Sequence, residues 1–201
     1  MEAISLKAIF GILSSLFIFA GGIPYINDII KKRIKPHILS WLGWGFLTGI
    51  GGFAMLAEGS TWAVALLFAN TVMCTAIAVS GAITKEGVWS TGIKDYIFFG
   101  AGLFGILLWQ VLNIPVLALV CAISADLAFG IPTIIKTFKD SSTETPIPWI
   151  LGWIGEVFGL LALSKLAFHE VAYPLYLFFF DTVIILIILK IIKKEGIRKY
   201  N

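Results

Sequence analysis

Three acidic residues, Asp126, Glu156 and Asp181, stand inside long apolar stretches of the sequence. A charge at the centre of a bilayer costs at least about 2.5–3.5 kcal/mol on insertion scales, so buried acids face a cavity, find partners or hold a proton. No basic residue lies at a comparable depth, since Lys190 follows Asp181 by nine residues, or about 13 Å along a helix. Apolar surroundings favour the neutral form of a carboxyl group. We therefore expect the three acids to carry a coupling proton; the alternative is that each serves only as a protonated hydrogen-bond donor.

Neutral polar and aromatic side chains accompany these acids. Asn70 lies deep in the third apolar stretch, and Trp44 and Trp153 lie near the starts of the second and the sixth. Indole faces stack on ring-shaped solutes and attract cations. We therefore predict a substrate-binding set that consists of Asn70, Asp181, Trp44, Trp153 and Glu156. The structural alternatives are an asparagine that joins two helices and tryptophans that mark the membrane interface.

Two prolines, Pro24 and Pro132, lie inside apolar stretches. Proline removes a backbone donor from a helix and kinks it. We interpret both as hinges, with a static kink as the alternative.

Other kinds of chemistry find little support in the sequence. Cys74 and Cys121 match no metal-ligand or disulfide spacing. The apolar stretches hold no serine with a partner histidine, and no glycine-rich phosphate loop occurs. We therefore expect no enzyme activity, no cofactor and no metal site.

The composition indicates a membrane environment. Hydrophobic residues make up 59% of the chain, charged residues 13%, and the mean hydropathy is +0.96. Soluble domains carry roughly 25% charged residues. A helix needs about 20 apolar residues to cross a bilayer, where each span must satisfy its own backbone. Seven stretches qualify and predict an all-α polytopic membrane protein with seven transmembrane helices: about 6–30, 38–57, 61–84, 95–113, 115–138, 147–166 and 171–192.

The basic residues predict an orientation in the membrane. With seven spans, every Lys and Arg except Lys7 and Lys165 falls on one side, and such residues favour the cytoplasmic side. We therefore expect the N-terminus outside and the C-terminus in the cytoplasm, in a prokaryotic inner membrane. This asymmetry accounts for the net charge of +3, so we expect the lipid bilayer as a partner and no nucleic acid.

Pairs of like residues recur at a slowly growing separation. It is 108 residues for Pro24 and Pro132 and reaches 111 in the third stretch, where 68–72 corresponds to 179–183. The pairs between them are Trp41 with Trp149, Trp44 with Trp153, Gly45 with Gly155 and Gly49 with Gly159. The pattern indicates a tandem repeat, so the first stretch is expected to remain as a mature helix rather than a cleaved signal. We predict a first three-helix repeat, a linker helix and a second three-helix repeat with a basic cytoplasmic tail: residues 1–90, 91–114 and 115–201.

The proline, the polar loop and the tryptophan-rich entry to the next stretch resemble the PQ-loop repeat of the SWEET (MtN3-saliva) transporter superfamily, in a divergent prokaryotic-type form. These features are Pro132, Ser142-Thr143-Glu144, Trp149 and Trp153. The resemblance implies two parallel three-helix bundles joined by an odd helix, a 3+1+3 layout. It also implies a central site lined by the third helix of each bundle.

The chain departs from that family at several positions. Tyr25 and Thr133 follow the prolines where the family has glutamine. SWEETs carry a pair of asparagines at the central site; Asn70 matches that position, and Asp181 does not. The counterpart of Glu156 in the first repeat stays open among three neighbours: Phe46, Leu47 and Thr48.

We expect the chain to transport a small polar solute, such as a sugar, amino acid, nucleoside or vitamin-like compound, by alternating access with proton coupling. The alternative is a non-transporting seven-helix receptor or scaffold of the same fold. Charged residues around an outward pocket would favour it, but the predicted outer loops offer only Glu58, Lys165 and Glu170. A retinal-binding protein is disfavoured because the last stretch has Asp181, not a lysine, at its middle. Whether copies associate as a homo-oligomer stays open.

Overall fold

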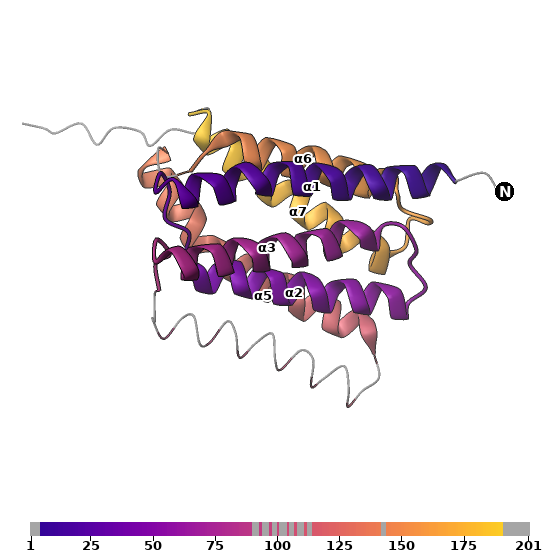
Figure 1. The fold of residues 1–201 in the computed structure, drawn as a ribbon. Helices are drawn as coiled ribbons and strands as arrows, with labels where there is room; N and C mark the ends of the chain where they lie inside the picture. Colours follow the sequence, from indigo (N-terminus) through magenta and orange to yellow (C-terminus); the bar gives the residue numbers. More distant parts are fainter. Residues whose placement is uncertain are drawn as a thin grey trace, which may run out of the picture.

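The computed structural model describes residues 5–89, 114–141 and 144–190, without the side chains of 132 and 136, and six single positions between 90 and 113. Within these residues the chain forms helices and no strand (Figure 1). The helices are α1 (Leu6–Ile30), α2 (Ile38–Ala57), α3 (Val64–Thr84), α5 (Pro115–Lys139), α6 (Pro146–Leu161) and α7 (Phe168–Ile188). The all-helical prediction is thereby confirmed for this part of the chain. The predicted span 95–113 lies outside the described residues except for those single positions.

Five of the six described helices are long and apolar enough to cross a membrane, and they indicate a multi-pass integral membrane protein. The exception is α6, which has 16 residues and a length of about 24 Å. We predicted a span over 147–166, but the helix ends at Leu161. The reason lies in the following turn, where the backbone N–H groups of Ser164 and Lys165 donate to Glu170 Oε2 at 2.7 and 3.2 Å instead of continuing the helix.

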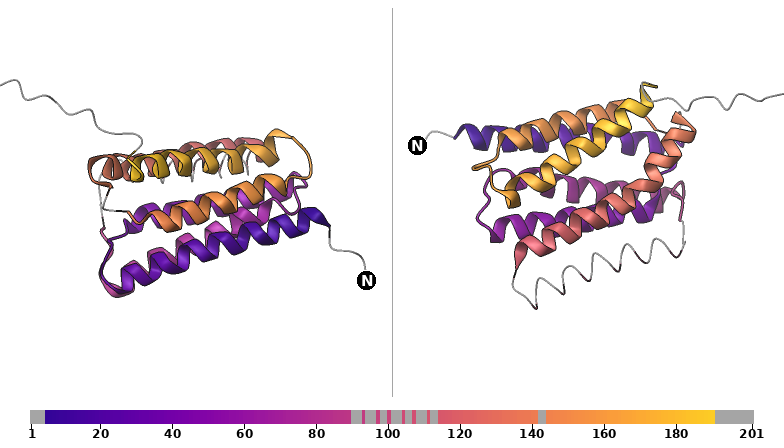
Figure 2. Two further views of the ribbon diagram at one scale, coloured as in Figure 1. Left: turned by 90° about the horizontal axis from the view of Figure 1, so that it is seen from above. Right: turned by 180° about the vertical axis from the view of Figure 1, so that it is seen from behind.

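Each described helix packs against two principal neighbours, so that the six form a ring. α1 packs against α3 and α6, α2 packs against α3 and α5, and α7 packs against α5 and α6. Figure 2 shows the same arrangement from two further sides. If α1 is exchanged with α5, α2 with α6 and α3 with α7, the list of helix pairs in contact stays the same.

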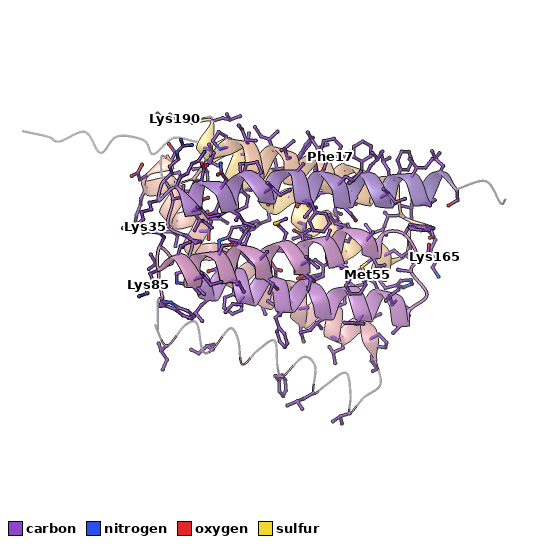
Figure 3. The ribbon with its side chains drawn as sticks, viewed as in Figure 1. Phe17, Lys35, Met55, Lys85, Lys165 and Lys190 are labelled. Carbon is purple, nitrogen blue, oxygen red and sulfur yellow. The ribbon has the colours of Figure 1, made fainter. Side chains whose placement is uncertain are left out.

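Basic side chains gather at one end of the ring. Figure 3 shows Lys35, Lys85 and Lys190 at that end and Lys165 at the other. α1, α3 and α7 end there, and α2 begins there. We call this the basic end. At the opposite end, Lys7 Nζ donates to the carbonyl of Leu161 at 2.8 Å.

Small residues allow the helices to approach closely. A Cβ atom on Gly21 would lie 2.8 Å from the carbonyl oxygen of Pro148, so α1 meets the backbone of α6 there. A Cβ on Gly43 would lie 3.0 Å from the ring of Phe129, where α2 meets α5. Close contact through small residues is the usual way that membrane helices associate.

The two predicted hinge prolines lie in continuous helices. α1 runs through Pro24 without interruption, and α5 runs through position 132. A hinge role for either residue stays a prediction.

Candidate functional site

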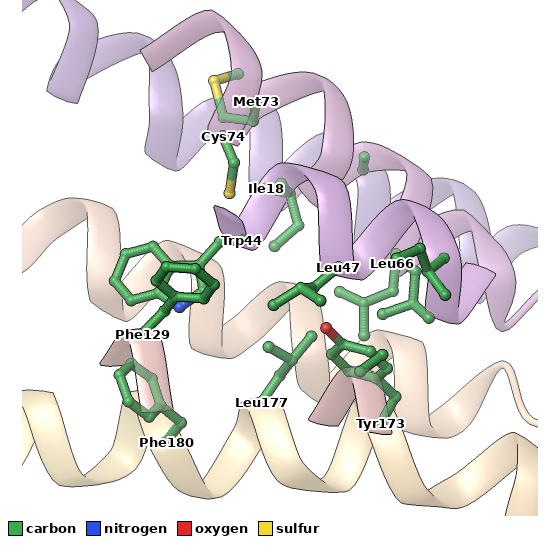
Figure 4. Packing of buried hydrophobic residues seen from close by; sticks show 14 of the residues in the cluster. Ile18, Trp44, Leu47, Leu66, Met73, Cys74, Phe129, Tyr173, Leu177 and Phe180 are labelled. Carbon is green, nitrogen blue, oxygen red and sulfur yellow. The ribbon is translucent and has the colours of Figure 1, made fainter. Parts of the chain in front are cut away.

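A cavity of about 90 Å³ lies inside the ring and receives residues from all six described helices. α1, α2 and α3 contribute Ile18, Gly21, Gly22, Tyr25, Trp41, Trp44, Thr48, Asn70, Met73, Cys74 and Ile77. α5, α6 and α7 contribute Asp126, Pro148, Trp149, Gly152, Glu156, Leu177, Phe180 and Asp181. Figure 4 shows part of this interior, with Trp44 of α2 and Phe180 of α7 approaching from opposite helices. The space suffices for a few water molecules or a small solute.

The three predicted acids all line this cavity. Asp126 and Glu156 are each 2% exposed and Asp181 is 9% exposed. Glu156 and Asp181 interact electrostatically with each other and with Asp126. The described lining contains no lysine, arginine or histidine. Three carboxyl groups therefore line one cavity whose described wall supplies no basic side chain.

Asp126 already has strong hydrogen-bond partners. The hydroxyl of Tyr173 donates to Asp126 Oδ2 at 2.6 Å, and the hydroxyl of Tyr176 donates to Oδ1 at 2.7 Å. Trp44 Nε1 donates to the backbone carbonyl of Asp126 at 3.3 Å. These bonds join α5 to α7 and α2. Asp126 thus positions the wall of the cavity, while its predicted role in carrying protons is untested.

Glu156 and Asp181 form a closer pair with unused hydrogen-bonding capacity. The two carboxyl groups lie close enough to interact electrostatically, and a hydrogen bond between two carboxyl groups would require a proton on one of them. Glu156 Oε2 is buried and has no hydrogen-bond partner among the described residues. Gly152 leaves the room that Asp181 occupies, because a Cβ at that position would lie 3.1 Å from Asp181 Oδ2.

Asn70 also lines the cavity. It belongs to α3, whereas the three acids belong to α5, α6 and α7. Its Nδ2 donates to the carbonyl of Leu66 at 3.1 Å, one turn earlier in the same helix. This bond lies within α3 and joins no second helix.

Aromatic rings cover much of the remaining wall. Trp41 contacts Trp44 at a centroid distance of 5.1 Å and Trp149 at 6.5 Å, and Phe180 lies 6.0 Å from Trp44 and 6.4 Å from Trp149. Our predicted binding set omitted Trp149. The signal that identifies it is its separation of 108 residues from Trp41, which also lines the cavity.

Trp153 is placed differently from our expectation, because it is not among the residues that line the cavity. Its Nε1 donates to Thr182 Oγ1 at 2.9 Å, and its ring contacts Phe178 at 5.1 Å. The predicted pairing of Trp44 with Trp153 therefore joins two positions with different surroundings. The residue 108 positions after Trp44 is Gly152, which does line the cavity.

The three acids have uncharged counterparts that share the cavity. Asp126 and Glu156 follow Ile18 and Thr48 by 108 positions, and Asp181 follows Asn70 by 111. All of these residues line the cavity. Of the three candidates for the counterpart of Glu156, Thr48 is the one that lines it.

A polar cluster, which we call the latch, lies beside the cavity towards the basic end. Glu144 Oε2 accepts hydrogen bonds from the hydroxyl of Tyr25 at 3.4 Å and from Trp149 Nε1 at 3.1 Å. Tyr25 and Trp149 line the cavity, and Glu144 belongs to the loop between α5 and α6. The sequence drew attention to Glu144 only as part of a polar loop, since nothing in the pattern linked it to Tyr25, 119 positions earlier.

The opposite end is held by a contact between two loops. Thr61 Oγ1 and Ser164 Oγ lie 2.8 Å apart, so the turn before α3 is joined to the turn after α6. At each end of the ring, therefore, hydrogen bonds join the helices α1–α3 or their loops to the helices α5–α7 or their loops.

The described residues contain no group of three or more His, Cys, Asp or Glu side chains that is arranged to hold a metal ion. Comparisons of the chain with protein-family models, with curated proteins and with solved structures give no match.

Proposed function

We propose that this chain is a membrane transporter that moves a small polar solute by alternating access. The observation that carries the proposal is the cavity that all six described helices line, together with three buried carboxyl groups in its wall. Buried ionisable groups inside membrane helices are costly and mark solute or ion pathways.

The architecture that we propose is 3+1+3. α1–α3 and α5–α7 would form two parallel bundles, with residues 91–114 as a linker helix, as in the SWEET and PQ-loop proteins that the sequence resembles. Two observations support it: the helix contacts are unchanged when the bundles are exchanged, and residues 108 or 111 positions apart line the same cavity. Substrate sites of such transporters lie at the interface of their repeats.

Alternating access requires that the two ends open in turn. In the described state the latch joins the two bundles at the basic end, and the contact between Thr61 and Ser164 joins them at the other. Breaking one set while keeping the other would expose the cavity to one side. Pro24 lies next to Tyr25 of the latch, which supports a hinge at that level. We further propose the cytoplasm at the basic end, in accordance with the positive-inside rule.

Proton coupling would use the Glu156 and Asp181 pair. A pair of interacting carboxyl groups can hold one proton between them and release it when a solute arrives. The absence of a basic residue from the described lining supports this role.

The test is uptake into liposomes that contain the purified protein. Labelled sugars, amino acids, nucleosides and small amines are offered with and without a pH gradient. We expect one class to accumulate above empty liposomes, and the pH dependence to disappear in Asp181→Asn. Glu58→Gln removes a carboxyl from the opposite-end loop and serves as the matched control. A solute that binds but never crosses would instead support the receptor alternative.

A further inference from the structure

We infer that the solute is a small organic cation, an amine or ammonium compound, whose nitrogen binds at Glu156 and Asp181 and whose apolar groups lie against the surrounding aromatic rings. The inference rests on the proposed function only in that the cavity is taken as a binding site.

The charge of the cavity favours a cation over other solutes. Its described lining holds three acids and no basic side chain. An anion would meet these carboxyl groups without a compensating partner. A sugar would require several hydrogen-bond donors and acceptors, but two of the indole N–H groups in this wall are already used, those of Trp44 and Trp149.

An unused acceptor marks where the positive charge would bind. Glu156 is 2% exposed, lines the cavity and has Oε2 without a hydrogen-bond partner among the described residues. Buried polar atoms are nearly always paired, so an orphaned one calls for an explanation. A cationic N–H donor would pair with Glu156 Oε2, and the adjacent Asp181 would add a second negative group.

Aromatic rings complete a site for an organic rather than a metallic cation. Trp44 and Trp149 each contact Phe180, with ring centroids 6.0 and 6.4 Å apart. Ring faces attract ammonium groups, most strongly when water is excluded. A metal ion would require more oxygen, nitrogen or sulfur ligands, and the described part of the chain has no such group of three. The cavity of about 90 Å³ limits the solute to a small one.

The experiment compares ammonium compounds with neutral compounds of the same shape. Purified protein in nanodiscs is titrated calorimetrically with choline and its uncharged analogue 3,3-dimethyl-1-butanol, and with butylammonium, butan-1-ol and butyrate. We expect at least one ammonium compound to bind at least about tenfold more tightly than its neutral analogue, and butyrate not to bind. Glu156→Gln and Asp181→Asn should each weaken that binding at least about tenfold, since each removes one charge of a buried pair. Glu58→Gln should leave it unchanged.

A second measurement does not depend on these variants folding. Cys74 lines the cavity. The experiment uses a Cys121→Ser variant, in which a thiol reagent can react only with Cys74 and therefore reports on the cavity. It is treated with methanethiosulfonates that carry a trimethylammonium, a hydroxyl or a sulfonate group. We expect the cationic reagent to react at least about tenfold faster than the anionic one, after correction for their rates with a free thiol.

Equal affinity for charged and neutral analogues, or equal corrected rates for the cationic and anionic reagents, would overturn the inference. The result is distinguishable from failure of the proposed function. Ammonium binding without uptake would contradict transport but support the cation site. Uptake of a neutral solute without ammonium binding would support transport but contradict the cation site.

Discussion

The helices α1–α3 and α5–α7 make equivalent contacts yet supply different chemistry. Three positions of the first set, Ile18, Thr48 and Asn70, line the cavity as an alkyl group, a hydroxyl and an amide. The positions 108, 108 and 111 residues later are all acids: Asp126, Glu156 and Asp181. One arrangement of helices is therefore compatible with either lining. In this chain every charge of the described lining comes from the second set.

The two interfaces between the sets differ in a matching way. On α1 and α6, Gly21 lies against Leu151, whereas on α5 and α2, Phe129 lies against Gly43. Phe129 and Leu151 follow Gly21 and Gly43 by 108 positions. The same contact is therefore made twice with the large and small residues exchanged. Close packing is kept in both because one partner lacks a side chain.

The difference in charge between α1–α3 and α5–α7 is tested most strongly by removing the carboxyl group of Asp181 or moving it to position 70. We expect Asp181→Asn to lower uptake at least about thirtyfold, because it leaves Glu156 without its charged partner. Asn70→Ser should have a much smaller effect, since the amide bonds only its own helix. The exchange Asn70→Asp with Asp181→Asn restores the number of charges. Full activity of the single variant Asp181→Asn in the liposome assay would contradict the asymmetry.

The interfaces should differ in their tolerance of a methyl group. A Cβ on Gly21 would lie 2.8 Å from a backbone oxygen, whereas a Cβ on Gly43 would lie 3.0 Å from a side-chain ring, that of Phe129. We expect Gly21→Ala to destabilise the protein by about 1–3 kcal/mol and Gly43→Ala to cost less. Gly49→Ala is the control, because its Cβ would lie at an ordinary 3.5 Å from Thr71. Thermal unfolding in detergent measures all three; equal losses for Gly21→Ala and Gly49→Ala would count against this packing.

The latch has no second copy in the described residues, and its removal should act at one end only. Thr133 follows Tyr25 by 108 positions, and Pro36 precedes Glu144 by 108 positions. The side chain of Pro36 cannot accept a hydrogen bond, so Thr133 and Pro36 cannot repeat the bond between Tyr25 and Glu144. Tyr25→Phe removes one bond worth about 0.5–1.5 kcal/mol, so we expect a roughly two- to tenfold faster reaction of Cys74 with thiol reagents in a Cys121→Ser background. Thr133→Val should not change this rate. An unchanged rate in Tyr25→Phe would show that the latch does not limit access.

The tryptophans give the smallest expected effect on binding. Trp153→Phe should lower stability by about 0.5–1.5 kcal/mol through loss of the bond to Thr182, and should leave the affinity for ammonium compounds unchanged. Trp149→Phe should weaken that affinity severalfold, because a phenyl ring attracts cations less strongly than an indole. Calorimetry on both variants makes the comparison, and a larger loss for Trp153→Phe would contradict the placement of the two rings.

The sequence was sufficient for the helical class and for the expectation that Asp126, Glu156 and Asp181 turn away from lipid. Long apolar runs leave few other structures, and acids within them must turn away from lipid. The direction in which a single side chain points was harder to predict from the sequence. Each residue turns a helix by about 100°, so Trp44, three residues after Trp41, and Trp153, four after Trp149, point in different directions.

Contacts between distant residues were the other feature beyond prediction. The latch joins a helix to a loop, and the loop has no periodicity that would indicate its partner. The end of α6 was missed for a similar reason: the residues after Leu161 are apolar enough to continue a span, and only the position of Glu170 shows why they do not.

The short helix α6 makes the protein thinner along the membrane normal at that position. A length of about 24 Å is less than the roughly 30 Å of a typical hydrocarbon core, so the peptide groups after Leu161 would sit at a depth where lipid offers them no acceptor. The buried carboxylate side chain of Glu170 supplies that acceptor from within the fold. The surrounding bilayer must thin beside α6, and the choice of lipid chain length in reconstitution thereby becomes a variable of its activity.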